Sequence, residues 1–589
     1  MPDRAPVRYA VDLSRRVHHL VTVRQTIPAD LSRGARVVLP VWTPGSYVVR
    51  HYARHVQRIS ARSAAGDLVL TADGHSAWLL PDDADGTVEI ELELYANDLT
   101  VRTNHVDDHH ALLIPAATFP FVDGARDREH RVTVHLPSGW RAWGLLPQVA
   151  GAFVATDYDH LVDSAFEAGT HEERRYEVAH VGHRLVWAGH GGRPDLDRIA
   201  ADAAAIGEAA VRLFDGDLPT DSYTFLCTAW DRGTGGLEHR DGAVVQVPVH
   251  ALTDPDAYRR FQALLAHEYL HLWNVKRLTP AALTALDYER PVFTESLWVA
   301  EGWTAYYDEL VVLRAGLWDT RRYLDRLGEL VERVLHRPGT AWQSLRQASY
   351  EAWIKHYLPD ENAPNAGVSY YDHGAVVAWC LDLLLRRLRP DGDGLDDVVA
   401  LLWHRFGRSA KGYQEGDVVA AVSEVAGSDV AGFFSRHVAG RELPPVEDLT
   451  EVVGLRLVTN DDDGPVAPDL GVEIREDDDG IVLRSVLRER PAWRAGLTGG
   501  DRLVAIDRTR VGRGELTPAL LGYRPGDEVE VVVFRGPRLV TATVTLGEPL
   551  PPRVLRPVEE GSRTQRNAFQ RWLGQPLTDV GQRRAPSPQ

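Results

Sequence analysis

The chain has 589 residues, enough for about three or four domains with separate hydrophobic cores. Its formal net charge of −19 argues against nucleic acid and against anionic membrane surfaces as partners. No apolar run is long enough to span a membrane, and the first residues lack the pattern of a signal peptide. We therefore expect a bacterial-type cytoplasmic protein. Cys227 and Cys380 stand in apolar runs and are expected to be buried thiols.

Short runs of alternating apolar and polar residues fill the first part of the chain. They include VRYAVDL, HLVTVRQTI and TVEIELELYA, and Gly, Pro and Asp separate them. This alternation predicts an antiparallel β domain over residues 1–172. A set of histidines in and after this region matches no ligand spacing and is interpreted as surface or packing residues: His105, His109, His110, His180 and His183.

The pattern becomes mostly helical from about residue 194 and remains so to about residue 443. Two strand-like runs interrupt it, SYTFLCTAW and AVVQVPVH, and the segment GGLEH between them is expected to be a loop. The acidic stretch TNDDDGPVAPD then predicts a linker or surface loop. Beyond residue 549 the chain is rich in Pro, with one helix-like patch at AFQRWLG, and the final GQRRAPSPQ is expected to be disordered.

One predicted helix carries the residues of a metal site. The stretch AHEYLHLWNVKRL places His267 and His271 four residues apart, with Glu268 beside the first. Residues four apart share one helix face, so both imidazoles can reach one metal ion. Glu268 would point to the side, where it can reach a metal-bound water without being a ligand. The alternative is a pair of half-buried histidines next to a carboxylate.

A catalytic zinc ion needs a third protein ligand and an open position. The next helical segment, ESLWVAEGWTAYYDELVVLRAG, contains Glu301 beside Val299, Ala300 and Trp303. A carboxylate in so apolar a turn needs a partner, and a metal ion would be one. The chain is rich in acids, so spacing alone does not select Glu301.

Motifs along the whole chain resemble those of one protein family. They are VWTPGSYVVRHYARHV near the N-terminus, GGLEH at 235–239, HEYLHLWNVKRL followed by WVAEGWTAYYDEL, and SYYDHG at 369–374. Together they resemble the glycyl aminopeptidase family of zinc peptidases, gluzincins that carry a PDZ domain. The likeness runs from about residue 8 to beyond residue 540, where PAWRAGLTGGDRLVAID resembles a PDZ motif.

The resemblance implies a multidomain α+β fold. An N-terminal antiparallel β domain at 1–172 would precede a thermolysin-like, mostly helical catalytic domain at 173–450, a PDZ domain at 451–549 and a C-terminal tail at 550–589. It also implies one Zn²⁺ per chain, held by His267, His271 and Glu301. Glu268 would then be the general base.

The same resemblance assigns roles around the metal. Glu238 of GGLEH would pair with the free α-ammonium of a peptide, and Gly235 and Gly236 would let the backbone approach. Tyr371 would donate to the oxygen on which negative charge develops. Tyr370 and Tyr307 are the alternatives for that donor.

Two further positions follow from the family pattern. Related aminopeptidases usually have lysine where this chain has His373, which would make the local charge depend on pH. In the PDZ domain, the backbone N–H groups of Leu470, Gly471 and Val472 would bind a peptide C-terminus. A PDZ fold used for packing is the alternative.

The sequence therefore predicts a zinc aminopeptidase that acts on peptides with a free N-terminus, with small first residues such as Gly or Ala favoured by the resemblance. One alternative is a zinc endopeptidase in which Glu238 does something else. Another is a non-catalytic scaffold that binds peptides through its PDZ groove. The intact set of candidate catalytic residues argues against the scaffold: His267, Glu268, His271, Glu301 and Tyr371.

Overall fold

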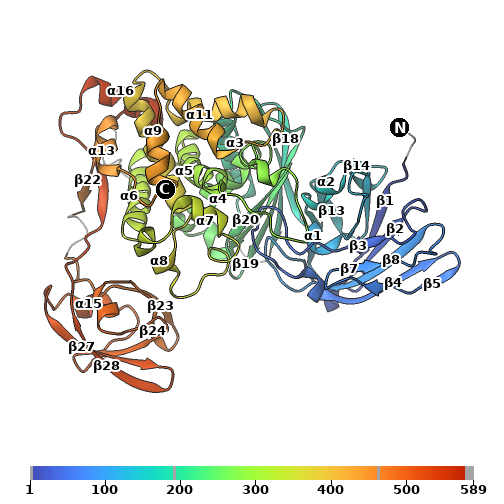
Figure 1. Cartoon of the computed structure of the whole chain (residues 1–589), viewed down its shortest axis with the longest axis horizontal. Helices are drawn as coiled ribbons and strands as arrows, with labels where there is room; N and C mark the ends of the chain where they lie inside the picture. The colour runs from blue at the N-terminus through green and yellow to red at the C-terminus, as the bar shows by residue number, and fades with distance from the viewer. Residues whose placement is uncertain (1–3, 190–193, 461–464, 578–589) are drawn as a thin grey trace. The chain divides into compact units, whose positions relative to one another are not determined.

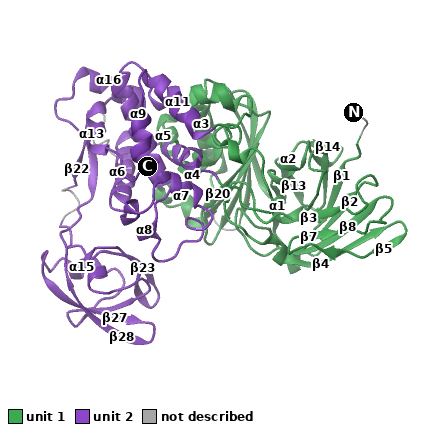
Figure 2. Ribbon diagram, viewed as in Figure 1, with its two compact units in different colours: residues 1–293, 307–317, 399–413 green, residues 294–306, 318–398, 414–589 purple. Residues whose placement is uncertain are grey.

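The computed structural model describes residues 4–189, 194–460 and 465–577 (Figure 1). The predicted disordered end, GQRRAPSPQ, lies outside the described residues. The chain divides into two compact units (Figure 2). Unit 1 holds 1–293, 307–317 and 399–413, and unit 2 holds 294–306, 318–398 and 414–589. Neither unit is one continuous segment of the chain.

Unit 1 begins with a large sheet of eight strands in the order β14-β15-β12-β1-β2-β8-β4-β5. Alternate residues of its central strands are buried, as the period of two predicts, and β1 pairs in parallel with β12. The strands are β1 Val7–Asp12, β2 Leu20–Ile27, β4 Val56–Ser63, β5 Gly66–Leu68, β8 Val88–Tyr95, β12 His130–His135, β14 Gln148–Val149 and β15 Ala152–Ala155.

Two smaller sheets complete this β-rich region, in the orders β13-β16-β10-β9 and β11-β3-β7-β6. Their strands are β3 Arg36–Val38, β6 Thr71–Ala72, β7 Ala77–Leu79, β9 His105–Val106, β10 His110–Leu113, β11 Phe121–Val122, β13 Arg141–Gly144 and β16 Phe166–Gly169. Short helical turns connect them: η1 Arg16–His18, η2 Tyr52–His55, α1 Pro115–Thr118 and α2 Tyr158–Val162. One hydrophobic core joins these sheets, so the predicted β-rich beginning of the chain is confirmed.

A second sheet in unit 1 has five strands in the order β17-β18-β19-β21-β20. They are β17 Glu172–Val178, β18 Val181–Gly189, β19 Tyr223–Trp230, β20 Gly235–His239 and β21 Gly242–Pro248. The two predicted strands are β19 and β21, and they run parallel to each other. GGLEH, expected to be a loop, is instead the edge strand β20, because Glu238 and His239 pair with Ala243 and Gly242 in a tight hairpin.

The long helices of unit 1 pack beside this sheet. The two long ones, α3 Leu196–Leu213 and α4 Pro255–Leu270, contact each other. Each starts at an aspartate, Asp195 or Asp254, whose side chain accepts a bond from a backbone N–H of the first turn. The shorter helices that lie wholly or partly in unit 1 are η3 Val249–Leu252, η4 Ala281–Leu283, α5 Thr304–Arg314, α10 Leu395–Leu402 and η7 Trp403–Gly407.

Unit 2 contains most of the remaining helices, which confirms the predicted helical middle of the chain. A π-helical turn, η5 Trp298–Trp303, packs against the long helix α9 Asp372–Leu388. The other helices are α6 Thr320–Leu335, η6 Pro338–Ala341, α7 Leu345–Tyr350, α8 Ala363–Ala366, α11 Glu415–Ala426, α12 Ala431–His437, α13 Val446–Thr450 and η8 Glu451–Val453.

A small β region with its own core ends unit 2. Its sheet has the order β23-β24-β25-β27-β28, with β26 paired to β25. The elements are β23 Val472–Asp477, β24 Gly480–Val486, α14 Pro491–Arg494, β25 Arg502–Ile506, β26 Thr509–Arg510, α15 Leu516–Leu520, β27 Glu528–Arg535 and β28 Arg538–Thr545. After it, β29 Arg553–Pro557 pairs with β22 Leu455–Thr459, and the predicted patch AFQRWLG lies in α16 Arg563–Leu573 and at its end.

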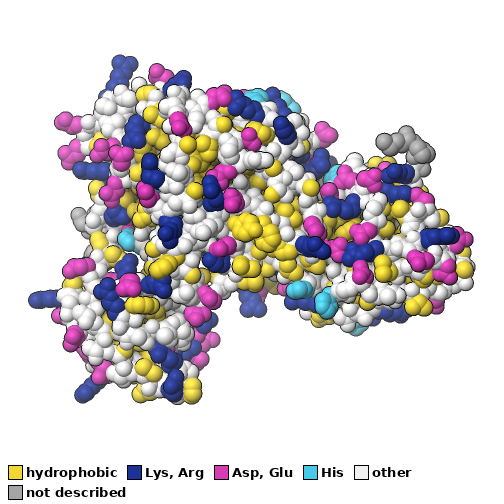
Figure 3. All heavy atoms as spheres, in the orientation of Figure 1, with side chains coloured by type: hydrophobic (Ala, Val, Ile, Leu, Met, Phe, Trp, Pro, Cys, Tyr) yellow, Lys and Arg dark blue, Asp and Glu magenta, His cyan; other side chains and the backbone are white. Residues whose placement is uncertain are grey.

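The surface carries many charges of both signs. On the face drawn in Figure 3, basic and acidic side chains are interspersed within each unit. Among the described residues, no helix is long and apolar enough to cross a membrane. Cys227 and Cys380 are buried thiols, as predicted.

Candidate functional site

The H-E-x-x-H motif lies at the C-terminal end of α4. His267 is in the last turn and His271 caps the helix, so one turn separates them and their ring centroids lie 4.7 Å apart. Pro255 starts the helix and ten of its residues are buried, which fixes the helix on the body of unit 1. The predicted helix therefore presents both imidazoles together.

Each of the two imidazoles is held at its Nδ1 atom. Nδ1 of His267 lies 3.0 Å from a carboxylate oxygen of Asp308, and Nδ1 of His271 lies 2.8 Å from the backbone oxygen of Asn274. Both partners are acceptors, so Nδ1 carries the proton and Nε2 the lone pair in both rings. Metal-binding histidines are commonly oriented in this way. The sequence reasoning missed Asp308, although it lies seven residues, or two helical turns, after Glu301.

Glu268 fits against the backbone of β20. Its side chain is buried, with 5% of the residue exposed. A Cβ atom added to Gly236 would lie only 2.5 Å from Cγ of Glu268 and closer still to its carboxylate. Gly236 of GGLEH is thus the residue that makes room for Glu268.

Glu238 lies in the same strand and is covered by the N-terminal part of unit 1. It is 4% exposed, and Oε1 has no hydrogen-bond partner among the described residues. A Cβ atom on Gly45, of the motif VWTPGSY, would lie 2.5 and 2.6 Å from the two carboxylate oxygens. Gly45 has φ +84°, a conformation that glycine adopts readily. Two motifs more than 180 residues apart therefore meet at one carboxylate.

The carboxylates Glu238 and Glu268 converge on His271. One potential ligand atom of each of the three lies within 4.8 Å of the others. A cavity of about 370 Å³ beside them is lined by Glu238, Lys276 and Tyr47, among others. Burial lowers the pKa of Lys276, but the nearby carboxylates Asp163, Glu238 and Glu268 outweigh it and raise the pKa, so the amine is charged.

Glu301 lies in unit 2, in the apolar turn that the sequence singled out. It is 2% exposed and sits in η5 between the buried Trp298 and Trp303. A Cβ atom on the next residue, Gly302, would lie 2.6 Å from Cα of Gly374. The glycine of SYYDHG therefore lets the tyrosine motif pack directly on the turn that holds Glu301.

Two tyrosines and a histidine surround this contact. Tyr371 is the N-cap residue of α9, and its ring centroid lies 4.7 Å from that of Tyr370 and 5.3 Å from that of His356. Burial lowers the pKa of His356, and the charge of Glu301 opposes that shift. His356 stands in no motif, and the sequence reasoning missed it. Tyr307, the other candidate donor, is buried in unit 1.

The expected pH-dependent charge at His373 is not supported. Burial, with a smaller contribution from the nearby His437, lowers the pKa of this residue to about 4, so the ring is neutral at neutral pH. His373 is 6% exposed on α9, inside the helical part of unit 2.

Leu470, Gly471 and Val472 lie where the small β region begins. Val472 starts β23, which is the edge strand of its sheet. Gly471 has φ +77°, and its N–H donates to Asp469 over 2.9 Å. Leu470 is buried in the core of this region.

The five histidines interpreted as surface or packing residues divide into two groups. His109 and His180 are exposed, and His183, on β18, is buried with its Nε2 2.9 Å from the hydroxyl of Tyr269. His105 and His110 are buried together with carboxylates. No known ligand spacing marked that cluster, and one of its carboxylates, Glu167, lies 57 residues after His110.

Models of three families match the chain. The M61 glycyl aminopeptidase model matches residues 260–377, the peptidase M61 N-terminal domain matches 8–170 and a PDZ domain matches 468–546. The small β region of unit 2 is therefore a PDZ domain, and the predicted fold class is confirmed.

One of the similar solved structures matches almost the whole chain. The aminopeptidase N family protein from Idiomarina loihiensis is 30% identical, with a TM-score of 0.91 over 96% of this chain and 100% of that chain. Structures of the M1 zinc metallopeptidase from Deinococcus radiodurans, mutant and unmutated, are 15% and 17% identical, with TM-scores of 0.47 and 0.45 over 75% of this chain and 95% and 94% of theirs. No curated protein matches the chain. Because the likeness to the first structure spans the whole chain and both peptidase models match, this chain belongs to the M61 glycyl aminopeptidase family and is an aminopeptidase that carries a PDZ domain.

Proposed function

We propose that the enzyme binds one zinc ion through His267, His271 and Glu301 and removes single residues, small ones such as Gly or Ala, from free peptide N-termini. The observation that carries the proposal is the paired orientation of the two imidazoles, each with Nδ1 bonded to an oxygen. Two such nitrogens and a buried carboxylate are the donors that zinc prefers in a catalytic site. When bound there, zinc would lower the pKa of a water molecule and polarise a carbonyl group.

Glu268 is the proposed general base. It would take a proton from the attacking water and pass it to the nitrogen of the departing amine. Its burial against Gly236 supports this role, because the strand fixes the position of the carboxylate. Tyr371 is the proposed donor to the oxygen on which negative charge develops.

Glu238 is proposed to bind the α-ammonium of the substrate. It is a buried carboxylate with an oxygen that lacks a described partner, and a buried charge is costly unless it is paired. Lys276 is not the direct hydrogen-bond partner of the Glu238 carboxylate, because its Nζ bonds to Asp163 over 2.8 Å. Gly235 and Gly236 would leave room for the substrate backbone along β20, the edge strand of its sheet.

The deciding experiment compares one short peptide with its N-acetylated form. In the wild type, kcat/KM should be at least about a hundredfold higher for the free peptide, a difference of about 3 kcal/mol. Glu238→Ala should remove most of that preference without loss of zinc. Asp231→Ala, in the exposed loop before β20, is the matched control and should keep the preference. Equal rates on both peptides in the wild type would favour the endopeptidase.

Two sets of variants distinguish the zinc ligands from the general base. Replacement of His267, His271 or Glu301 by Ala should abolish zinc binding at this site and activity together. Glu268→Gln should keep zinc but lower kcat by several orders of magnitude, because an amide cannot accept the proton. A Glu301→Ala enzyme with full zinc and full activity would mean that another residue is the third ligand.

The PDZ domain is proposed to bind a peptide C-terminus through the backbone of Leu470, Gly471 and Val472, beside the edge strand β23. A peptide with a free C-terminal carboxylate should bind this protein, and its amide should not.

The domain limits 1–172, 173–450, 451–549 and 550–589 remain predictions, and each family match falls within one of them. The cytoplasmic location also remains a prediction.

A further inference from the structure

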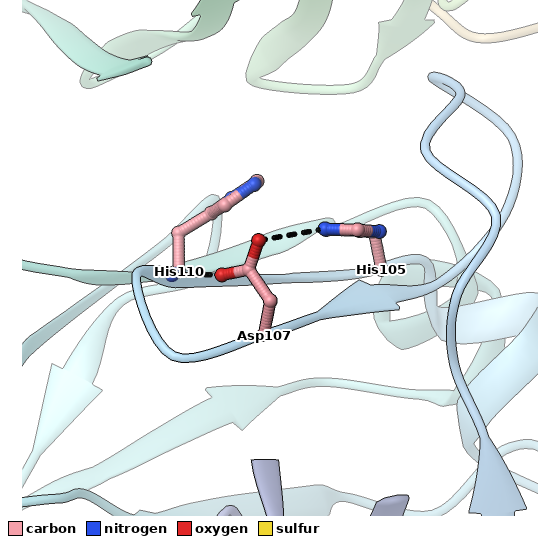
Figure 4. A group of neighbouring side chains, drawn as sticks. All are labelled: His105, Asp107 and His110. Carbon is pink, nitrogen blue, oxygen red and sulfur yellow. Dashed lines mark hydrogen bonds and ion pairs between the residues drawn. The ribbon is translucent and has the colours of Figure 1, made fainter. Parts of the chain in front are cut away.

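A second cluster of potential ligands lies in the β-rich part of unit 1, and it shares no residue with the candidate peptidase site. His105 and His110 stand on the hairpin strands β9 and β10, and Asp107 lies in the turn between them (Figure 4). One ligand atom from each of these three residues lies within 4.8 Å of the other two. Glu167 of β16 and His171, just after it, form a second such group with the same His110.

The turn holds Asp107 in a fixed place. Its Oδ1 accepts the backbone N–H groups of His109 and His110 over 2.7 and 2.9 Å. Its Oδ2 lies 3.1 Å from Nε2 of His105, and Figure 4 shows that nitrogen turned toward the carboxylate. The carboxylate is therefore positioned before any ligand arrives.

His110 is oriented from the other side. Its Nδ1 lies 3.0 Å from Oε1 of Glu167, and the same oxygen lies 3.0 Å from Nε2 of His171. Nε2 of His110 is buried and has no hydrogen-bond partner among the described residues, although the residue is only 2% exposed. A buried polar atom without a hydrogen-bond partner is rare in folded proteins, and this nitrogen is available to bind a ligand from outside the chain.

We propose that His105, Asp107 and His110 form a second metal site, which takes zinc or another late first-row divalent cation. His110 would bind through Nε2 while Glu167 accepts its Nδ1–H, the carboxylate–histidine–metal arrangement that orients many metal ligands. Two imidazoles and one carboxylate suit these ions better than they suit calcium or magnesium.

Charge and access agree with this assignment. Asp107 and Glu167 are both largely shielded from solvent, with side chains 14% and 2% exposed, so the cluster contains two carboxylates that need positive charge nearby. A divalent cation would supply it. His105 also lines a cavity of about 520 Å³, which provides a route for an ion from solvent. Without metal, the same residues would form a hydrogen-bonded network that ties the hairpin to β16.

The test uses the full-length protein and counts metal ions. After removal of loosely bound metal, the wild type should contain about two ions per chain, and His110→Ala and Asp107→Asn about one each. Asp107→Asn keeps an oxygen for the two backbone N–H groups, so the hairpin turn should survive. His109→Ala on the same turn is the control, because its side chain is 55% exposed, and it should keep both ions.

A second measurement separates this site from the peptidase site. Metal-free His271→Ala protein should still bind about one Zn²⁺, and Zn²⁺ should raise its Tm by at least about 2 °C. The double variant His110→Ala/His271→Ala should show neither effect. If metal-free His271→Ala protein binds no Zn²⁺ and its Tm does not change, the cluster is a hydrogen-bonded network and the inference is wrong. Failure of the peptidase proposal would look different, because zinc would then depend on His110 but not on His271.

Discussion

The replacement of Gly236 by alanine tests whether β20 positions Glu268. The added Cβ atom would lie 2.5 Å from Cγ of Glu268, whereas ordinary contact begins at 3.4 Å. The side chain must therefore withdraw by about 0.9 Å, and its carboxylate by more, because the carboxylate is closer still. Gly236 does not have a positive φ, so the backbone itself accepts alanine without strain.

We expect the Gly236→Ala substitution to lower kcat. A displacement of about 1 Å in a reacting group lowers the rate by about a hundredfold, which corresponds to about 2.7 kcal/mol in the activation free energy. Gly236→Ala should therefore lower kcat by about this factor and leave the zinc content unchanged. Steady-state kinetics on a short free peptide, together with metal analysis, measure both quantities.

The control is the same substitution in the same sheet. Gly182 lies in β18, and a Cβ atom there would meet nothing within 4 Å, so Gly182→Ala should behave as the wild type. If Gly236→Ala retained the wild-type kcat, the carboxylate of Glu268 would not need its present position, and its role as the base would be refuted.

Three further predictions concern other parts of the molecule. Tyr371→Phe should lower kcat more than it raises KM, whereas Tyr370→Phe should change kcat little; the opposite result would make Tyr370 the donor. Asp308→Asn should weaken zinc binding by about 10- to 100-fold in a chelator competition, because Asp308 orients His267, and an unchanged affinity would contradict this. Burial lowers the pKa of His130 to about 4, so between about pH 6.5 and pH 4 the unfolded chain takes up a proton that the folded ring does not. The free energy of unfolding should fall by up to about 3 kcal/mol over that range, and His130→Asn should reduce this dependence in denaturation curves measured at several pH values.

The sequence was most informative where a local pattern determines the structure. The apolar period and the aspartate before Pro255 predict α4, and the spacing of His267 and His271 places their rings together. Alternation in the first part of the chain likewise predicts the strands, because one face of each is buried. The family motifs then added the PDZ domain.

These local patterns could not predict contacts between residues that are far apart in the sequence. GGLEH has the glycines of a loop, but pairing with β21 makes it a strand. His356, in the turn after α7, and Asp308 of α5 approach the candidate residues only in the folded chain, and no spacing in the sequence predicts that. His105, Asp107 and His110 are close in the sequence, but Glu167 lies 57 residues after His110, and only the pairing of β10 with β16 brings its carboxylate to that ring.

The position of β20 at the edge of its sheet also bears on how the enzyme would work through a long peptide. A substrate that adds to this edge as a further strand presents alternate side chains to opposite faces. After one residue is removed, the shortened peptide must move forward by one position, and that shift turns every side chain to the other face. The peptide cannot slide into place while it remains paired. We therefore expect it to dissociate and rebind between cuts, so that products shortened by one residue accumulate before those shortened by two.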